Sequence, residues 1–471
     1  MNSVVYSCLI EHLSEELGDF THEIFSTDCS LYRDDYFETR RLLRSLALVC
    51  HDWSYLARKT LQRRIIIRSD RGLRSFSTNC DIGPWIKEFY LEPTSTIPFE
   101  EEYDVSDSDS TEYTAGSDSE ISGYGSDQNS VSDVEDDWRN YTRFCKSVNF
   151  FSQNLAPRLG NLRCLGINIR YLYYQFEYSE SEMHGFLRAL QHIPALEGLF
   201  IVGAGEEGDE SDEILDEFIL CLCNTISKLS HLTHLWVSGL NCTESLLTNI
   251  PEEVQNLQPP PRLRSVGFDV PNSHLPFHTL LWPRYGHPQT LTQLVISTSC
   301  IDYSGNNLDE FMRAINHSST IVRLHLEFTV AENSVEVRNL LTSLLPILTS
   351  LRELHIAYET VDHLRAFPPN LKHLRLEFHS MPHFLSVCQG EQSWGICSAI
   401  RFGSLPHLER MTFIIPRGFE ALDAVAFRHF SQYSMAAIIH AETGIIPCFE
   451  DVGLAAKKRL LADSFGCPGR L

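Results

Sequence analysis

A short apolar pattern, Leu-x-x-Leu-x-φ with φ aliphatic or aromatic, recurs along most of this chain. Its clearest copy is Leu351/Leu354/Ile356, and successive starts from Leu162 onward lie 20 to 37 residues apart. The other copies are Ile86/Phe89/Leu91, Leu162/Leu165/Ile167, Leu196/Leu199/Ile201, Leu232/Leu235/Val237, Leu263/Val266/Phe268, Leu291/Leu294/Ile296, Ile321/Leu324/Leu326, Leu371/Leu374/Leu376 and Leu408/Met411/Phe413. Self-similarity at this period predicts a stacked repeat architecture, because one such unit cannot bury its apolar face alone.

Each copy has the spacing of a short strand. Side chains alternate along a strand, so Leu354 and Ile356 point to one face while Glu353, His355 and Ala357 point to the other. Apolar stretches at helical spacing lie between several copies, at residues 186–190, 218–222, 311–315 and 340–344. The sequence therefore predicts an α/β leucine-rich-repeat solenoid, a parallel sheet lined by helices. The alternative is a set of unrelated buried strands in an ordinary α/β domain.

The pattern and the composition divide the chain into five parts. These are a helical domain at 1–68, the first strand and a junction at 69–98, an acidic serine-rich insertion at 99–137, the solenoid at 138–416 and a C-terminal helical cap at 417–471. The cap is predicted as two helices, one from about Ala421 and one from about Phe449. They would cover the end of the core, since an open solenoid end exposes apolar surface.

The insertion differs from the rest of the chain in composition. Between Glu100 and Asp137 there are fourteen acidic residues, nine serines and no Lys or Arg, in a chain whose net charge is −24. Low hydrophobicity with high net charge predicts disorder. An acidic residue follows three positions after each of four serines, a pattern that acidophilic kinases prefer: Ser106, Ser117, Ser130 and Ser132. A solvated spacer that is never modified is the alternative.

Several functional classes are disfavoured by the sequence. No run of eighteen apolar residues occurs, and the acidic balance argues against nucleic-acid binding, which needs basic surface. The start lacks the basic residues of a signal peptide, and fourteen cysteines show no disulfide-like spacing, so we expect cytoplasm or nucleus. Neither catalytic motifs nor zinc-ligand spacing is found. We therefore expect a protein that is not an enzyme and needs no cofactor, metal, membrane or nucleic acid.

The strand residues that face away from the leucines are candidates for binding a substrate protein. Phe200 and Trp236 fall on neighbouring strands, and exposed aromatic side chains often dominate interfaces. Further along, this face becomes basic and rich in histidine. The six candidates are Phe200, Trp236, Arg323, His325, His355 and Arg375. The alternative is a solvated sheet surface with cross-strand pairs, such as His325 beside His355.

The N-terminal domain carries a family resemblance. Leu46-Ala-Leu-Val-Cys-His-Asp-Trp53, followed by Leu56-Ala-Arg58 and a strand at 65–67, resembles the second half of a fungal F-box, Leu-x-x-Val-Cys-x-x-Trp, ahead of a repeat domain. The resemblance implies that the N-terminal helices bind the Skp-type adaptor of a cullin–RING ubiquitin ligase and that the solenoid holds an unknown substrate protein. The adaptor-binding residues it implies are Leu9, Leu13, Leu46, Val49 and Trp53.

A second hypothesis stays open beside this one. The opening Leu-Pro-x-Glu of the F-box is not found at residues 1–4. The chain could therefore be a solenoid scaffold or binding module outside ubiquitination, with a degenerate F-box kept as an end cap.

Overall fold

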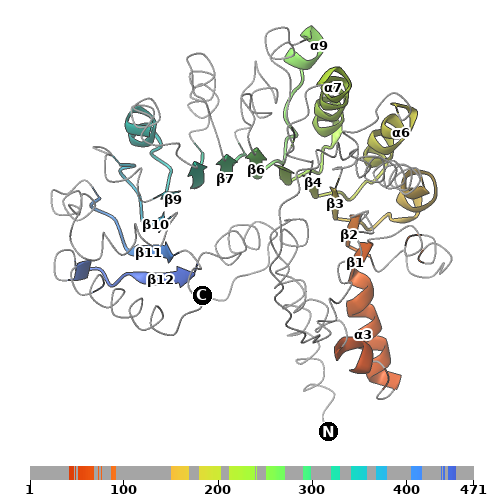
Figure 1. The fold of residues 1–471 in the computed structure, drawn as a ribbon, viewed down its shortest axis with the longest axis horizontal. Helices are drawn as coiled ribbons and strands as arrows, with labels where there is room; N and C mark the ends of the chain where they lie inside the picture. Colours follow the sequence, from red (N-terminus) through yellow and green to blue (C-terminus); the bar gives the residue numbers. More distant parts are fainter. Residues whose placement is uncertain are drawn as a thin grey trace, which may run out of the picture.

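The computed structural model describes thirteen main segments of the chain together with a few single positions (Figure 1). The segments are 42–46, 51–67, 86–91, 150–168, 180–202, 212–238, 251–270, 290–298, 320–328, 341–357, 367–378, 405–415 and 444–451. The predicted insertion at 99–137 lies outside them. So does most of the predicted cap at 417–471.

The described strands form one twelve-stranded sheet in which each strand is hydrogen-bonded to the next strand of the sequence. Every pairing is parallel. The strands are β1 (Arg64–Ile67), β2 (Glu88–Leu91), β3 (Cys164–Asn168), β4 (Gly198–Val202), β5 (His234–Ser238), β6 (Ser265–Val270), β7 (Gln293–Thr298), β8 (Arg323–Phe328), β9 (Glu353–Ala357), β10 (His373–Glu377), β11 (Arg410–Ile415) and β12 (Cys448–Asp451). The predicted parallel sheet is confirmed: all ten copies of the pattern lie in it, as does the short strand at 65–67.

The last strand, β12, was not predicted. The sequence indicated a helix from about Phe449, but Phe449 lies in β12 and is paired in register with the buried Phe413 of β11. The prediction was wrong at this position because pairing with a free sheet edge outweighs a short stretch's own preference for a helix. Phe413 and Phe378 are also close, with ring centroids 6.0 Å apart.

The sheet is curved, and the described helices that follow β2 lie on its outer side (Figure 1). They are α6 (Glu180–Gln191), α7 (Asp212–Lys228), the short α9 (Glu252–Gln255) and the single turns η2 (Phe151–Leu155), η3 (Ala156–Arg158) and η7 (Leu345–Ile347). The leucines of the pattern are buried between sheet and helices. The apolar stretches at 186–190 and 218–222 fall within α6 and α7, as predicted, and residues 341–344 are helical. The stretch at 311–315 lies outside the described residues.

Hydrogen bonds at the start of each strand hold the repeats together. The backbone N–H groups of Arg352 and Glu353 both donate to the carbonyl oxygen of Val322, at 2.9 and 3.1 Å, and this arrangement recurs along the sheet. Threonine hydroxyls satisfy further carbonyls: Thr290 donates to Leu263 at 2.6 Å, and Thr320 to Leu291 at 2.7 Å. Buried carbonyl groups need such partners, so each repeat completes the backbone hydrogen bonding of the one before it.

A helical segment precedes the sheet. Helix α3 (His51–Arg63) runs directly into β1, and residues 42–46 are also helical. Leu43 and Ala57 are fully buried, so this segment has apolar packing of its own. Among all the helices that the structure describes, none combines the length and the apolar character needed to cross a lipid bilayer.

Candidate binding surfaces of the sheet

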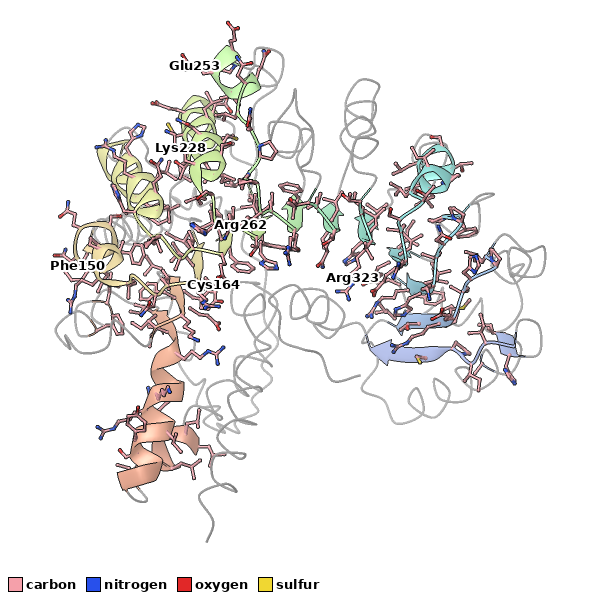
Figure 2. The ribbon with its side chains drawn as sticks, turned by 180° about the vertical axis from the view of Figure 1, so that it is seen from behind. Phe150, Cys164, Lys228, Glu253, Arg262 and Arg323 are labelled. Carbon is pink, nitrogen blue, oxygen red and sulfur yellow. The ribbon has the colours of Figure 1, made fainter. Side chains whose placement is uncertain are left out.

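The inner face of the sheet, opposite the helices, carries the side chains that alternate with the buried leucines. Arg323 projects from this face (Figure 2). In register, the inner-face positions line up in rows across the strands. We call one of these rows the middle row; it consists of Gly166, Phe200, Trp236, Gly267, Val295, His325, His355, Arg375 and Thr412. The structure thus brings five of the six predicted substrate-binding residues into one row, and Arg323 into the row beside it.

The aromatic half of the middle row is buried. Phe200 is 2% exposed and Trp236 is 3% exposed, so their predicted role as exposed anchors is wrong. Each has a glycine beside it in register: Phe200 is paired with Gly166, and Trp236 with Gly267. A Cβ atom on Gly267 would lie 2.0 Å from Cε3 of Trp236, so the indole occupies the space that the glycine leaves open.

The polar half of the middle row is also buried, and the predicted exposure of His325, His355 and Arg375 is wrong as well. The rings of His325 and His355 stack with centroids 3.7 Å apart and planes 12° from parallel. On the other side of the stack, His355 Nε2 lies 3.0 Å from Glu377 Oε2. The cross-strand pair offered as the alternative is confirmed, but it is buried rather than solvated. Large side chains on strands about 4.8 Å apart cover one another.

Charged side chains in the neighbouring row are paired. Glu353 lies 3.4 Å from Nε of Arg323 and 3.5 Å from Nδ1 of His373. The other ring nitrogen of His373 lies 2.9 Å from the Thr412 hydroxyl. Burial acts to raise the pKa of Glu353, but the hydrogen bond and charge of His373, with the charges of Arg323 and Arg375, lower it on balance. Glu353 is therefore held as a carboxylate by its neighbours.

These contacts decide what the inner face can do. Between β8 and β11, acids contact bases and the histidine rings cover each other, so little polar surface remains for a partner. In the described part of the chain, the middle row is therefore a second buried layer, aromatic in one half and polar in the other, and packing explains its residues better than contact with a substrate.

A different surface is exposed. The strand-start edge consists of the residues immediately before β1 to β11: Arg63, Lys87, Arg163, Glu197, Thr233, Arg264, Thr292, Val322, Arg352, Lys372 and Glu409. Six of these eleven residues are basic, and all six are exposed, in a chain whose net charge is −24. Sequence reasoning missed this edge, although the signal was available: each of these residues except Arg63 directly follows the first position of the repeated pattern.

The basic residues of the strand-start edge are most concentrated at its N-terminal end. The charge of Arg63, with burial and the charge of Arg163, lowers the pKa of Lys87. Lys59 contributes in the same direction, and Glu88 opposes it. Like charges that disfavour one another's protonation create a positive potential, which favours an acidic partner.

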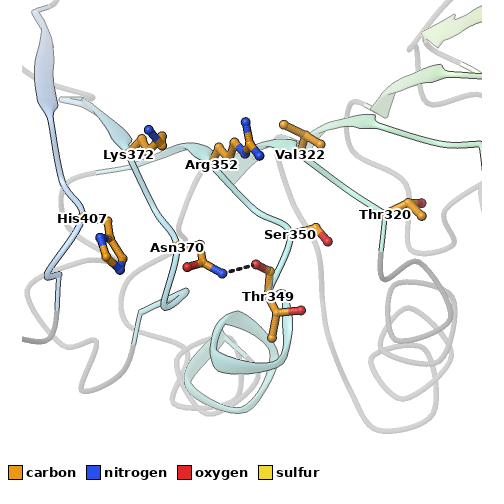
Figure 3. Close-up of a pocket in the computed structure, with 8 residues that line it drawn as sticks. All are labelled: Thr320, Val322, Thr349, Ser350, Arg352, Asn370, Lys372 and His407. Atoms are coloured by element: carbon orange, nitrogen blue, oxygen red, sulfur yellow. Dashed lines mark hydrogen bonds between the residues drawn. The ribbon is translucent and has the colours of Figure 1, made fainter.

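A pocket opens at the other end of this edge (Figure 3). Its volume is about 620 Å³, and its lining includes Arg352, Asn370, Lys372 and His407 from the segments that lead into β9, β10 and β11. The Asn370 amide donates to the carbonyl oxygen of Thr349 at 2.8 Å, which fixes the wall of the pocket. Lys372 is also paired with Glu409 at 2.5 Å. The pocket therefore combines the basic Arg352 and Lys372 with small polar and apolar side chains.

The predicted adaptor-binding residues fall mostly outside the described residues. This applies to Leu9, Leu13 and Val49; Trp53 lies within α3, but its side chain is not described. Leu46 is half-buried. Nearby, the structure exposes three large apolar side chains that sequence reasoning did not select: Leu42 at 47%, Leu48 at 85% and Tyr55 at 56%.

Comparisons with known proteins add no assignment. A scan of the chain against protein-family models found no match, and a search of curated proteins found none either.

Proposed function

We propose that this chain is a substrate-recognition subunit of a Skp–cullin–F-box ubiquitin ligase and catalyses no reaction itself. In this proposal, the sheet with its outer helices is a leucine-rich-repeat solenoid, and residues 1–68 are an F-box-like docking domain. Two facts support it: the strands follow the sequence order with their pattern leucines buried, and residues 46–53 resemble an F-box. Such a subunit accelerates ubiquitin transfer by proximity alone.

The observation that carries the proposal is the exposed apolar surface ahead of the sheet. Five large hydrophobic side chains are exposed in the described part of the chain, and three of them, Leu42, Leu48 and Tyr55, lie within the predicted F-box-like domain at 1–68. Isolated exposed hydrophobic residues are common, but a concentration of them marks a protein-binding surface. They are not the residues that the F-box resemblance implies, but they lie in the same predicted domain, at 1–68.

The substrate surface in this proposal is the strand-start edge rather than the inner face. The inner-face residues are engaged with one another, whereas Lys87, Arg163, Arg264, Arg352 and Lys372 are exposed. A basic edge increases the association rate of an acidic partner and selects against a basic one. We therefore expect the substrate to present an acidic segment.

Adaptor binding tests the proposal. The purified chain should bind a Skp-type adaptor at micromolar concentration or below. Leu42→Asp or Tyr55→Asp should weaken binding by thirtyfold or more, since loss of an interface anchor costs about 2 kcal/mol. Both side chains are about half exposed, so the circular dichroism spectrum should not change.

Ile347→Asp is the matched control, because Ile347 is 49% exposed but lies in η7, far along the sequence from the docking domain. It should bind the adaptor as the unsubstituted chain does. Absence of adaptor binding by the unsubstituted chain, or equal weakening by all three substitutions, would contradict the proposal. The scaffold hypothesis would then be preferred.

A further inference from the structure

Helices α6 and α7 pack side by side on the outer face of the sheet (Figure 1). Phe186 and Leu190 of α6 and Phe218 and Leu222 of α7 are buried. Near the C-terminal ends of the two helices, the Gln191 amide donates to the Thr225 hydroxyl at 3.4 Å. The two helices are therefore held in a defined relative position.

Three metal-ligating side chains converge on this contact between the helices. Nε2 of His184 in α6, a carboxylate oxygen of Glu217 and Sγ of Cys221 in α7 all lie within 4.8 Å of one another. Glu217 and Cys221 are four residues apart, which places them on the same face of α7. His184 and Cys221 are partly exposed and Glu217 is exposed, so an ion can enter from solvent.

The separation between two of these groups suits a bound ion. His184 Nε2 lies 3.7 Å from Glu217 Oε1. This is longer than the roughly 2.7 to 3.2 Å of a hydrogen bond. Zinc holds histidine nitrogen at about 2.0 to 2.1 Å and carboxylate oxygen at about 2.0 to 2.2 Å, so a nitrogen and an oxygen around a tetrahedral ion lie about 3.3 to 3.5 Å apart. The observed distance exceeds this interval by about 0.2 Å, a difference that a small movement of the exposed Glu217 side chain closes on binding.

The second cluster of possible ligands in the described residues fails the same comparison. His325, His355 and Glu377 also lie within 4.8 Å of one another. However, the two imidazole rings are stacked nearly parallel, 3.7 Å apart, and each ring nitrogen directs its lone pair within its own plane. One ion cannot lie in both planes.

The neighbouring cysteine on α7 cannot replace Cys221. Cys223 is fully buried and belongs to the hydrophobic core, whereas Cys221 is partly exposed. Cys221 lies on the side of the helix that His184 reaches.

We propose that His184, Glu217 and Cys221 bind a Zn²⁺ ion that links α6 to α7, with water as the fourth ligand. On binding, the Cys221 thiol releases its proton to solvent and the thiolate coordinates the metal, with no change of oxidation state. The mixed sulfur, nitrogen and oxygen donors suit zinc better than calcium or magnesium, which prefer oxygen alone. This site is independent of the proposed ligase function.

Cobalt binding tests the site directly. The full-length chain, stripped of metal, is titrated with Co²⁺ and examined by absorbance, since a cobalt–thiolate bond gives a charge-transfer band. We expect this band to appear, and Zn²⁺ to abolish it by displacing the cobalt. Cys221→Ser should eliminate the band, and His184→Asn should weaken cobalt binding at least tenfold. Zn²⁺ should raise the Tm of the unsubstituted chain by several degrees and leave that of His184→Asn unchanged.

Cys448→Ser provides the control, because Cys448 is an exposed cysteine in β12 outside the cluster. It should retain the band. The proposal is overturned by the absence of a band in the unsubstituted chain, by its persistence in Cys221→Ser, or by its loss in Cys448→Ser. Because all three ligands are at least partly exposed, the variants should fold, and circular dichroism verifies this.

Discussion

At the scale of single residues, burial changes the role that a side chain's chemistry suggests. His325 and His355 look like candidates for recognition when the sequence is read alone, because they alternate with buried leucines and are polar. In the structure each is 1% exposed and they stack on one another. Strand alternation correctly predicted the face on which they lie. It could not predict that neighbours of similar size would cover them.

His234 yields a prediction about pH. Burial, aided by the charge of Arg264, lowers the pKa of His234 to about 4. An unfolded chain's histidine titrates near 6.5, so below that pH the unfolded state takes up a proton that the folded state does not. This contribution to stability is complete above pH 6.5 and is lost progressively as the pH falls toward 4. We expect a loss of about 1 to 2 kcal/mol at pH 5, measured by urea denaturation.

The variant His234→Gln isolates this effect, since glutamine does not titrate. Its free energy of unfolding should fall less between pH 7 and pH 5 than that of the unsubstituted chain. His407→Gln, at an exposed position of the pocket, should keep the original pH dependence. Identical pH profiles for all three proteins would show that His234 is not the group responsible.

At the scale of elements, the repeated pattern predicted ten of the strands and the faces that they bury, and the apolar stretch at 65–67 predicted an eleventh. The period-two alternation and the recurring leucines are local signals, and they were sufficient to predict where these strands lie and which side chains they bury. The sequence did not predict strand β12, because its pairing with β11 is a contact between distant segments. The sequence also did not predict that His184, Glu217 and Cys221 lie close together. These residues belong to two helices that are brought together only by packing.

The contact between β5 and β6 can be tested by adding one methyl group. Gly267→Ala would place a Cβ atom 2.0 Å from the Trp236 ring, so the ring or the strand must move. Overpacking of this kind costs about 1 to 3 kcal/mol, and chemical denaturation should show a loss of that size.

Gly185→Ala is the matched control for this substitution. Gly185 lies within α6, and a Cβ atom there meets nothing within 4 Å. Because alanine favours helix more than glycine does, this variant should be about 0.5 to 1 kcal/mol more stable. If Gly267→Ala is as stable as the unsubstituted chain, Trp236 does not pack on Gly267 as described.

At the scale of the whole molecule, the sheet grows by one strand for each repeat, and long insertions between strands leave the pairing intact. Strands β2 and β3 pair in register although 72 residues separate Leu91 from Cys164. Loop length adds only slowly to the entropy cost of closure. Composition identified the acidic part of this connection without any structural information.

Deletion of residues 100–137 should therefore leave the Tm within a few degrees. The segment carries fourteen acidic residues and no basic ones, so it has little apolar surface to contribute to a core. Differential scanning calorimetry of the deleted and complete chains makes the comparison. A fall of about ten degrees or more would mean that the segment packs against the rest of the protein.

The proposed function makes its most direct claim about where the adaptor binds. Hydrogen–deuterium exchange of the full-length chain, with and without a Skp-type adaptor, measures this position. We predict slower exchange on adaptor binding in residues 42–63, which contain Leu42, Leu48, Tyr55 and helix α3, and unchanged exchange in strands β4 to β11. Unchanged exchange in 42–63 at saturating adaptor, or slower exchange confined to the sheet, would contradict the account.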